Sequence, residues 1–486
     1  MSYLDLTIEE IHSAIIAGKV TPKELVVEAL KRAKADSNNA FEYLYEKEAL
    51  EAVEKLDESK NNNIFYGIPV IIKDNFSTKD IPTTGSSNIL NGYVPVYSAT
   101  VVSRLEEAGA IAIAKSTLDE LAMGGSGTTG HLGTTYNPWD KNHQHLIGGS
   151  SCGSAAAVSA GVTPFALGSD TGDSVRKPAS YSGLVGFKPT WGRISRYGLF
   201  PFATSLDHVG FFTRSVKDSA YSLQILAGRD EHDASSSFKP VDDYVSDIDK
   251  PIKGKKIAII KSINESITNK EILASFNKSL DSLKSKGAII NVCDVDVDLL
   301  KAIYPTYVVI SCAESTSNNA NLDGIKYGPR YNGESYEEVM TKARTEGFGE
   351  VIKRRFVIGG YSLLKENQEE LFLKAQKARR LIVDAFNKIL EDNDVIYVPA
   401  APSTAPLISN KNIDTLSDEY LIADNYLAFG NFGGLPSITL PIGILDNLPF
   451  GGNLTGKAFD EKTVLNIANV LEETTGYKNL MAKEGK

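Results

Sequence analysis

A lysine and two glycine-rich serine loops are the residues of this chain whose types could act together in catalysis. Lys73 ends the apolar run 68–72, the first loop reads Gly-Gly-Ser-Ser-Cys-Gly-Ser at 148–154, and the second reads Ser-Asp-Thr-Gly-Asp-Ser-Val-Arg-Lys-Pro-Ala at 169–179. A serine hydroxyl becomes an effective nucleophile when a base takes its proton, and a neutral lysine can be that base. The pKa of such a lysine must fall from about 10.4 to about 7–8, which burial achieves most readily. The set therefore predicts acyl transfer without histidine or metal.

The second loop could also stabilise negative charge. It follows the strand-like run 164–168, and its consecutive small residues let backbone N–H groups converge on one point. The helix-like run 154–158 would direct its N-terminus at the first loop. Taken singly, however, each loop could be an ordinary turn, and Lys73 could be a surface lysine at the end of a strand.

The three elements together, in this order, resemble the amidase signature family. That resemblance implies a triad in which Lys73 is the base, Ser150, on a cis peptide, relays the proton, and Ser174 is the nucleophile that forms the acyl-enzyme. It further implies an oxyanion hole built from the backbone N–H groups of Thr171, Gly172, Asp173 and Ser174.

Further motifs make the chain similar to the A subunits of the glutamyl-tRNA(Gln) amidotransferases within that family. These motifs lie at 119–124, 137–140, 192–199, 323–328, 346–355 and 459–463. The resemblance implies a glutaminase that passes ammonia to the B subunit, which would carry ATP and Mg and convert Glu-tRNA(Gln) to Gln-tRNA(Gln), with aspartyl-tRNA as a second possible acceptor. It also implies a heterotrimer completed by a small C subunit, tRNA bound only through the partner, and no metal or organic cofactor in this chain.

Glutamine, the implied substrate, needs a cation for its carboxylate and an anion for its ammonium. The resemblance assigns these roles to Arg355, with Arg354 as its rival, and to Asp424; Tyr307 is a weaker pocket candidate. Read without the resemblance, the Arg-Arg pair is more typical of a solvated helix face.

Four departures from the family pattern bear on these expectations. Cys152 and Asp173 stand where glycine is usual, Lys177 stands where glutamine is common, and the segment 124–131 replaces a stretch that helps to form the glutamine pocket. An Asp173 carboxylate turned inward would oppose the oxyanion, whereas one turned outward would leave the chemistry intact; we expect the outward orientation. Two alternatives therefore stay open: a stand-alone amidase acting on other amides, and a scaffold protein of the complex whose catalysis Asp173 impairs.

Composition sets the class of protein. The 486 residues carry a net charge of −10 and are 42% apolar, as expected of a soluble globular chain that does not itself grip nucleic acid. Three scattered cysteines favour a reducing, cytoplasmic setting. Neither a secretory leader nor an apolar run long enough for a membrane span is apparent, so we expect no membrane association.

Alternating strands and helices must position these residues, which predicts an α/β amidase signature fold: a large twisted mixed β-sheet covered by helices on both faces. We expect one domain over 1–486, with a helical segment at 1–64, a signature core at 65–228, a surface linker at 229–252 and a second α/β portion at 253–486 that completes the sheet. Capping boxes at Thr7 and Thr21 predict the first two helices. Strands are predicted at 68–72, 111–115, 164–168, 288–294, 395–400 and 436–442, and helices at 100–109, 267–286, 366–391 and 460–474.

Three shorter patterns are poor evidence for other functions. The segment 125–130 has the dinucleotide spacing G-x-G-x-x-G, but it follows a helix-like run rather than a strand. Gly149–Gly153 matches a nucleophile elbow centred on Ser151, yet no strand precedes it. The histidines His143 and His145 lack a third metal ligand nearby in the sequence.

Overall fold

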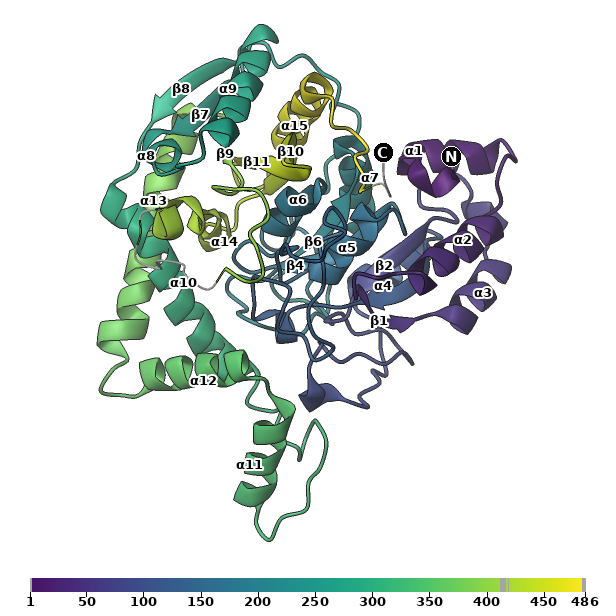
Figure 1. The fold of residues 1–486 in the computed structure, drawn as a ribbon, viewed down its shortest axis with the longest axis vertical. Helices are drawn as coiled ribbons and strands as arrows, with labels where there is room; N and C mark the ends of the chain where they lie inside the picture. Colours follow the sequence, from purple (N-terminus) through teal and green to yellow (C-terminus); the bar gives the residue numbers. More distant parts are fainter. Residues whose placement is uncertain (1, 411–416, 418, 483–486) are drawn as a thin grey trace.

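One mixed β-sheet runs through the computed structural model, which describes residues 2–410, 417 and 419–482 (Figure 1). The described residues form 11 strands in the order β1-β3-β2-β4-β6-β5-β10-β11-β9-β7-β8. The strands are β1 (Phe41–Leu44), β2 (Pro69–Lys73), β3 (Ile111–Ser116), β4 (Phe165–Asp170), β5 (Val185–Lys188), β6 (His208–Thr213), β7 (Lys256–Ile260), β8 (Ile289–Cys293), β9 (Val395–Pro399), β10 (Ser437–Leu445) and β11 (Leu448–Gly456).

Helices connect and cover these strands. They are α1 (Ile8–Ile16), α2 (Pro22–Lys34), α3 (Glu46–Glu54), α4 (Thr100–Glu107), α5 (Cys152–Ser159), α6 (Arg176–Ser182), α7 (Val216–Leu226), α8 (Lys261–Glu265), α9 (Lys270–Ser285), α10 (Val297–Asn318), α11 (Tyr336–Gly347), α12 (Glu350–Leu363), α13 (Lys374–Asp392), α14 (Phe429–Phe432) and α15 (Glu461–Thr475). Figure 1 shows α11 extending away from the body that the sheet organises.

Two large hydrophobic cores pack the sheet against helices, and at β9 they lie on opposite faces of it. In β9 the buried Tyr397 belongs to one core, whereas its neighbours Ile396 and Val398 belong to the other, as the alternation of a strand requires. The first core also takes apolar side chains from α9 and α15, and the second takes them from α10 and α13. The predicted fold class, a mixed sheet with helices on both faces, is therefore confirmed.

The catalytic candidates come from parallel strands. β2 pairs in parallel with β3 on one side and with β4 on the other. Parallel strands present their carboxyl ends at the same sheet edge, so Lys73, which ends β2, lies at the same edge as Asp170, which ends β4. This topology brings the lysine to the second serine loop, although about a hundred residues separate them in the chain.

Most of the predicted elements are present. Thr7 and Thr21 each cap a helix in a capping box, and Pro22 occupies the first turn of α2. The strands predicted at 68–72, 111–115 and 164–168 correspond to β2, β3 and β4, and the helix after the first serine loop is α5.

Other segments differ from the predictions. Residues 41–44, within the helical segment expected at 1–64, form the edge strand β1 beside β3. The segment 229–252, expected as a surface linker, has no helix or strand, and its Tyr244, Ile248 and Ile252 are buried in the first core.

The strands from 65–228 and from 253–486 share the one sheet. That the chain is a single domain stays a prediction.

Candidate active site

Lys73 is completely buried at the end of β2 and is surrounded by hydroxyl groups. Its Nζ lies 2.9 Å from the Oγ of Ser150, 2.8 Å from that of Ser151 and 2.9 Å from that of Ser169. The first two serines come from the loop before α5, and the third lies within β4. The structure therefore brings Lys73 and Ser150 into direct contact.

Burial changes the acidity of this lysine. It lowers the pKa of Lys73 from 10.5 to about 7, even though Cys152, Asp119, Asp170 and Asp207 act in the opposite direction. A substantial fraction of neutral amine is then present near neutral pH. This is the condition that a lysine base must meet.

The hydrogen bonds distinguish the two adjacent serines. The Ser151 hydroxyl donates to the backbone oxygen of Ser169 at 3.1 Å, so its own proton is already committed and it accepts from Lys73. Ser169 Oγ accepts from the side-chain amide of Asn75 at 3.0 Å. Among the described residues, the Ser150 hydroxyl is bonded to the lysine alone. Within the pair, Ser150 is therefore the hydroxyl that is free to exchange a proton with the amine.

The peptide bond between Gly149 and Ser150 is cis, and a carboxylate fixes the segment that packs against it. Asp119 accepts hydrogen bonds from the backbone N–H groups of residues 126–129 at 2.9–3.1 Å. Gly149 in turn donates to the backbone oxygen of Gly125 at 3.0 Å. The segment 124–131, which departs from the family pattern, is thus an ordered wall beside Ser150. No helix begins directly after this segment, since the next one, α5, starts at Cys152, so the dinucleotide interpretation of 125–130 fails.

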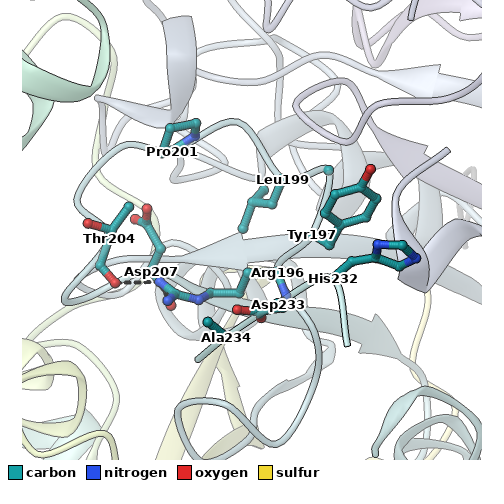
Figure 2. Close-up of a pocket in the computed structure, with 10 residues that line it drawn as sticks. Arg196, Tyr197, Leu199, Pro201, Thr204, Asp207, His232, Asp233 and Ala234 are labelled. Atoms are coloured by element: carbon teal, nitrogen blue, oxygen red, sulfur yellow. Dashed lines mark hydrogen bonds between the residues drawn. The ribbon is translucent and has the colours of Figure 1, made fainter. Parts of the chain in front are cut away.

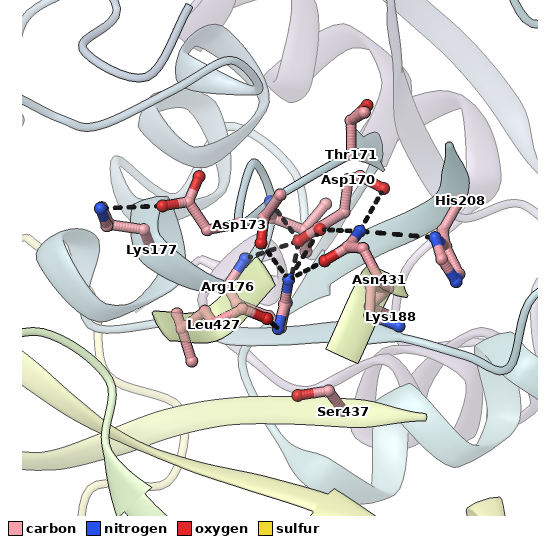
Figure 3. A network of polar contacts seen from close by, with 12 residues as sticks. Asp170, Thr171, Asp173, Arg176, Lys177, Lys188, His208, Leu427, Asn431 and Ser437 are labelled. Carbon is pink, nitrogen blue, oxygen red and sulfur yellow. Dashed lines mark hydrogen bonds and ion pairs between the residues drawn. The ribbon is translucent and has the colours of Figure 1, made fainter. Parts of the chain in front are cut away.

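Ser174 lies in the loop between β4 and α6, and a buried ion pair holds that loop (Figure 3). The Asp170 carboxylate accepts from the backbone N–H of Val175 at 3.0 Å and pairs with the Arg176 guanidinium at 2.9 Å. Asn431, which is remote in sequence, donates to Asp170 at 2.9 Å. Burial alone would raise the pKa of Asp170, but the Arg176 guanidinium holds it below its usual range, so this carboxylate stays ionised.

This arrangement leaves backbone donors of the second serine loop unengaged. Arg176 donates to the backbone oxygen of Gly172 at 2.6 Å. Within the described part of the chain, the backbone N–H groups of residues 171–174 donate no hydrogen bond, and neither does the Ser174 hydroxyl. Ser174 is 4% exposed, and its backbone oxygen accepts from the N–H of Ser151 at 3.3 Å, which joins the two serine loops. The loop thus presents a hydroxyl and unengaged N–H groups together, as an oxyanion hole requires.

Two of the departures from the family pattern bond to each other. The Asp173 carboxylate lies 2.8 Å from the Nζ of Lys177, and Figure 3 shows it turned toward that lysine. Cys152 is buried at the start of α5, and burial raises the pKa of its thiol to about 12, so it remains a neutral small side chain.

The residues expected to hold glutamine lie at different distances from this loop. The Tyr307 ring packs on Gly172 so closely that an added Cβ there would lie 3.0 Å from it. Asp424 reaches the loop through Lys177, 3.2 Å from its Nζ. Arg355 is half-buried with its guanidinium 5.5 Å from the centre of the Phe202 ring. Burial raises the pKa of Tyr307, and the charge of Arg355 opposes that rise.

Arg354, the rival of Arg355, is exposed, as a solvated helix face predicts. The two neighbouring arginines of α12 therefore differ in their surroundings, and Arg355 is the one whose charge acts on Tyr307.

A cavity of about 280 Å³ lies near the second serine loop (Figure 2). Its wall includes Arg196, Tyr197, His232 and Asp207, and Asp207 accepts a hydrogen bond from the Thr171 hydroxyl at 2.7 Å. Lys73, Ser150 and Ser174 do not line it. The cavity therefore borders the loop but is not where the serine would meet a substrate.

The sequence did not single out several residues that build this site. Ser169 contacts the lysine amine and is itself held by Asn75, while Arg176 and Asn431 fix the second serine loop. Asn75 carries a weak signal, because it stands two positions after Lys73, and Ser169 lies in the loop motif itself. Asn431 has no such signal, since only the tertiary fold brings it to Arg176.

The described residues form neither a candidate metal site nor a candidate membrane span. No group of three or more His, Cys, Asp or Glu side chains there is placed to hold a metal ion. None of the described helices has both the length and the apolar character to cross a membrane.

Comparisons with known proteins agree with this geometry. The model of the family described as Amidase matches residues 24–465. The chain is 42% identical over 480 residues to the A subunit of the glutamyl-tRNA(Gln) amidotransferase of Pediococcus pentosaceus, with 98% of each chain covered. It is 41% identical over 485 residues to the corresponding A subunit of Fusobacterium nucleatum, again with 98% of each chain covered.

Solved structures lead to the same family. The crystal structure of the glutamyl-tRNA(Gln) amidotransferase A subunit from Thermotoga maritima superposes with a TM-score of 0.81 at 37% identity and covers 97% of this chain and 95% of that one. A peptide amidase in complex with the inhibitor chymostatin superposes with a TM-score of 0.82 at 25% identity and covers 98% and 99% of the two chains. The buried lysine beside the cis-linked serine, the two glycine-rich serine loops and these similarities lead to one conclusion: this chain belongs to the amidase family.

Proposed function

We propose that this chain is the glutaminase subunit of a tRNA-dependent amidotransferase and releases ammonia from glutamine through an acyl-enzyme on Ser174. The observation that carries the proposal is the buried Lys73 amine, with a pKa of about 7, in contact with Ser150 at 2.9 Å. The relatives at 42% and 41% identity over nearly the whole chain are named as A subunits of glutamyl-tRNA(Gln) amidotransferases, which favours this function over that of a stand-alone amidase.

The proposed reaction uses each of the three side chains once in each direction. Neutral Lys73 takes the proton of Ser150 as Ser150 takes that of Ser174, and the Ser174 oxygen attacks the side-chain amide carbon of glutamine. The carbonyl oxygen becomes an oxyanion that accepts from the free N–H groups of residues 171–174. The Lys73 ammonium then returns the proton through Ser150 to the leaving nitrogen, which departs as ammonia. Water enters by the same proton path and releases glutamate.

Substrate selection is proposed to depend on the two charged ends of glutamine. Arg355 would pair with the α-carboxylate and Asp424 with the α-ammonium, while Tyr307 would pack beside the side chain above Gly172. Asp424 is 29% exposed at its side chain, so one carboxylate oxygen remains accessible to a second cation in addition to Lys177.

The ammonia is proposed to pass to the B subunit, which would hold ATP and Mg and the glutamyl-tRNA, while a small C subunit completes a heterotrimer. The net charge of −10 supports tRNA contact through a partner rather than through this chain. We further propose a cytoplasmic location and a single domain over 1–486, in which the segments 65–228 and 253–486 fold as one unit because they share a sheet.

The test measures ammonia from glutamine, with the chain alone and with co-expressed partner subunits. We expect Ser174→Ala to abolish ammonia release and Ser151→Ala, its matched control in the neighbouring loop, to retain much of it. Equal loss from both substitutions would contradict the assignment of the nucleophile. Full turnover without partners and without need for Arg355 or Asp424 would identify a stand-alone amidase. A complex that assembles but releases no ammonia would identify a scaffold protein.

A further inference from the structure

Lys177 lies between the loop that carries Ser174, here called the nucleophile loop, and the segment that carries Asp424. Its Nζ is 2.8 Å from the Asp173 carboxylate, 2.7 Å from the backbone oxygen of Asp424 and 3.2 Å from the Asp424 carboxylate. An ammonium has three N–H donors, so these three contacts satisfy it completely. The side chain of Lys177 is 9% exposed, and burial would lower its pKa, but Asp173 and Asp424 raise it well above its ordinary value. Lys177 is therefore a permanently charged bridge.

A carboxylate at position 173 would interfere with the proposed oxyanion hole if it turned inward. It directly precedes Ser174 in a loop whose N–H groups, at residues 171–174, donate to no other group of the described chain. Such N–H groups attract any nearby anion, and Asp173 is a carboxylate of the same loop. A carboxylate that occupied them would both block the oxyanion and repel it. In the structure this carboxylate is instead directed at the Lys177 ammonium (Figure 3).

We infer that Lys177 is a positioning residue of the proposed glutaminase, and that it does two separable things. It holds the Asp173 carboxylate away from the N–H groups that would bind the oxyanion, and it ties Asp424, the proposed partner of the substrate ammonium, to the nucleophile loop. This inference rests on the proposed function. The first contact acts on the transition state and governs kcat, whereas the second acts on substrate binding and governs KM.

The charges of Lys177, Asp173 and Asp424 together also favour a substrate that carries an ammonium group. Two carboxylates and one ammonium leave one net negative charge in a largely buried place. A substrate that brings its own ammonium completes the charge balance, whereas an amide without one leaves the second carboxylate only half-paired. Lys177 therefore neutralises Asp173 and leaves Asp424 to the substrate.

A double-mutant cycle separates these roles. Lys177→Gln is measured in the natural chain and in the Asp173→Gly background, with the partner subunits present, and kcat and KM for ammonia release from glutamine are determined for all four proteins. In the natural background we expect kcat to fall about 100-fold, the scale of losing one oxyanion donor. In the Asp173→Gly background the same substitution should change kcat by less than about threefold, because no carboxylate remains to be released. KM should rise in both backgrounds, since Asp424 loses its anchor in both.

Two further variants guard against a trivial loss of structure. Lys177→Arg keeps a cation between the two carboxylates and should retain most of the kcat that Lys177→Gln loses. Lys462→Gln removes another lysine that pairs with an aspartate, Asp247 at 3.0 Å, far from the serines, and should leave kcat and KM unchanged. Thermal unfolding midpoints establish that each variant is folded at the assay temperature, and if Lys177→Gln is not, Lys177→Met, which also removes the cation but keeps the length of the side chain, takes its place in both backgrounds.

Equal losses of kcat in the two backgrounds, or no loss in either, would overturn the inference while leaving the proposed function intact. A natural chain whose complex releases no Ser174-dependent ammonia would instead refute the proposed function. The two failures are therefore distinguishable in the same set of proteins.

Discussion

The pH dependence of ammonia release tests the central claim, that a neutral lysine is the base. A fall in the pKa of Lys73 from 10.5 to about 7 corresponds to about 5 kcal/mol of work done by burial against the charged form. At pH 7 about half of the molecules then carry a neutral amine, compared with about 3 in 10,000 for an unperturbed lysine. We expect kcat/KM for glutamine to fall about tenfold for each pH unit below about 6.5 and to level off above pH 8.

The assay is ammonia release by the complex with its partner subunits, between pH 5.5 and 9.5 at constant ionic strength. Far-UV circular dichroism at each pH provides the control for unfolding. A kcat/KM that continues to rise tenfold per unit up to pH 9.5 would refute the argument, because it would mean that the lysine keeps its ordinary pKa. A profile that is flat across pH 6–8 would refute it equally, since no base would then titrate in this range.

The same pKa predicts an independent effect on stability. Between pH 7 and 10.5 the unfolded chain binds a proton at Lys73 that the folded chain lacks, so the contribution of this group to the free energy of unfolding rises with pH across that window. The unfolding free energy of the natural chain relative to Lys73→Met should therefore increase from pH 7 to pH 9, by about 2–3 kcal/mol. Denaturant titrations of both proteins at the two pH values measure it.

Two further predictions concern the walls of the site. Gly149→Ala would place a Cβ 1.9 Å from a carboxylate oxygen of Asp119, so we expect the free energy of unfolding to fall by about 1–3 kcal/mol and kcat to fall strongly. The matched control is Gly125→Ala, which has open space around its Cβ and should leave both quantities nearly unchanged. Urea titrations and ammonia assays measure the two effects. Arg355→Lys should raise KM for glutamine at least about tenfold with a smaller effect on kcat, because a lysine cannot bind the substrate carboxylate through two parallel N–H groups as an arginine can. Arg354 is exposed, so Arg354→Lys should leave KM unchanged. Similar KM values for the two variants would contradict the assignment of the carboxylate site.

The site was predictable from the sequence to the extent that its residues are close in the chain. Lys73 follows a continuous apolar run that is typical of a buried strand, and both serine loops combine glycine with small hydroxyl residues before a helix, the second of them directly after a strand. Their assembly required the family resemblance, because spacing alone does not show that β2 and β4 are neighbours.

The rest depended on contacts between distant segments. Asn431 meets Arg176 across 255 positions, and no local pattern announces such a pair. Strand β11 contains Gly451 and Gly452, which are typical of a loop, yet an added Cβ at Gly452 would lie 2.5 Å from the hydroxyl of Tyr397, so glycine is what the close packing of β9 and β11 demands. Helix α10 contains Pro305 and has no single apolar face, and it packs against both α12 and α13, so neither a periodic pattern nor the absence of proline announces it.

The hairpin of β10 and β11 has a consequence for how the protein must be made. These strands lie between β5 and β9, so they join the sheet half built from the first part of the chain to the half built from the second. Until the ribosome has released residues up to 456, β5 and β9 each present an unsatisfied edge in the nascent polypeptide. The segment that supplies Asp424 and Asn431 emerges immediately before this hairpin. The two halves of the sheet can therefore join only after the hairpin has been made, and a polypeptide interrupted before it would keep both strand edges unpaired and be prone to aggregate.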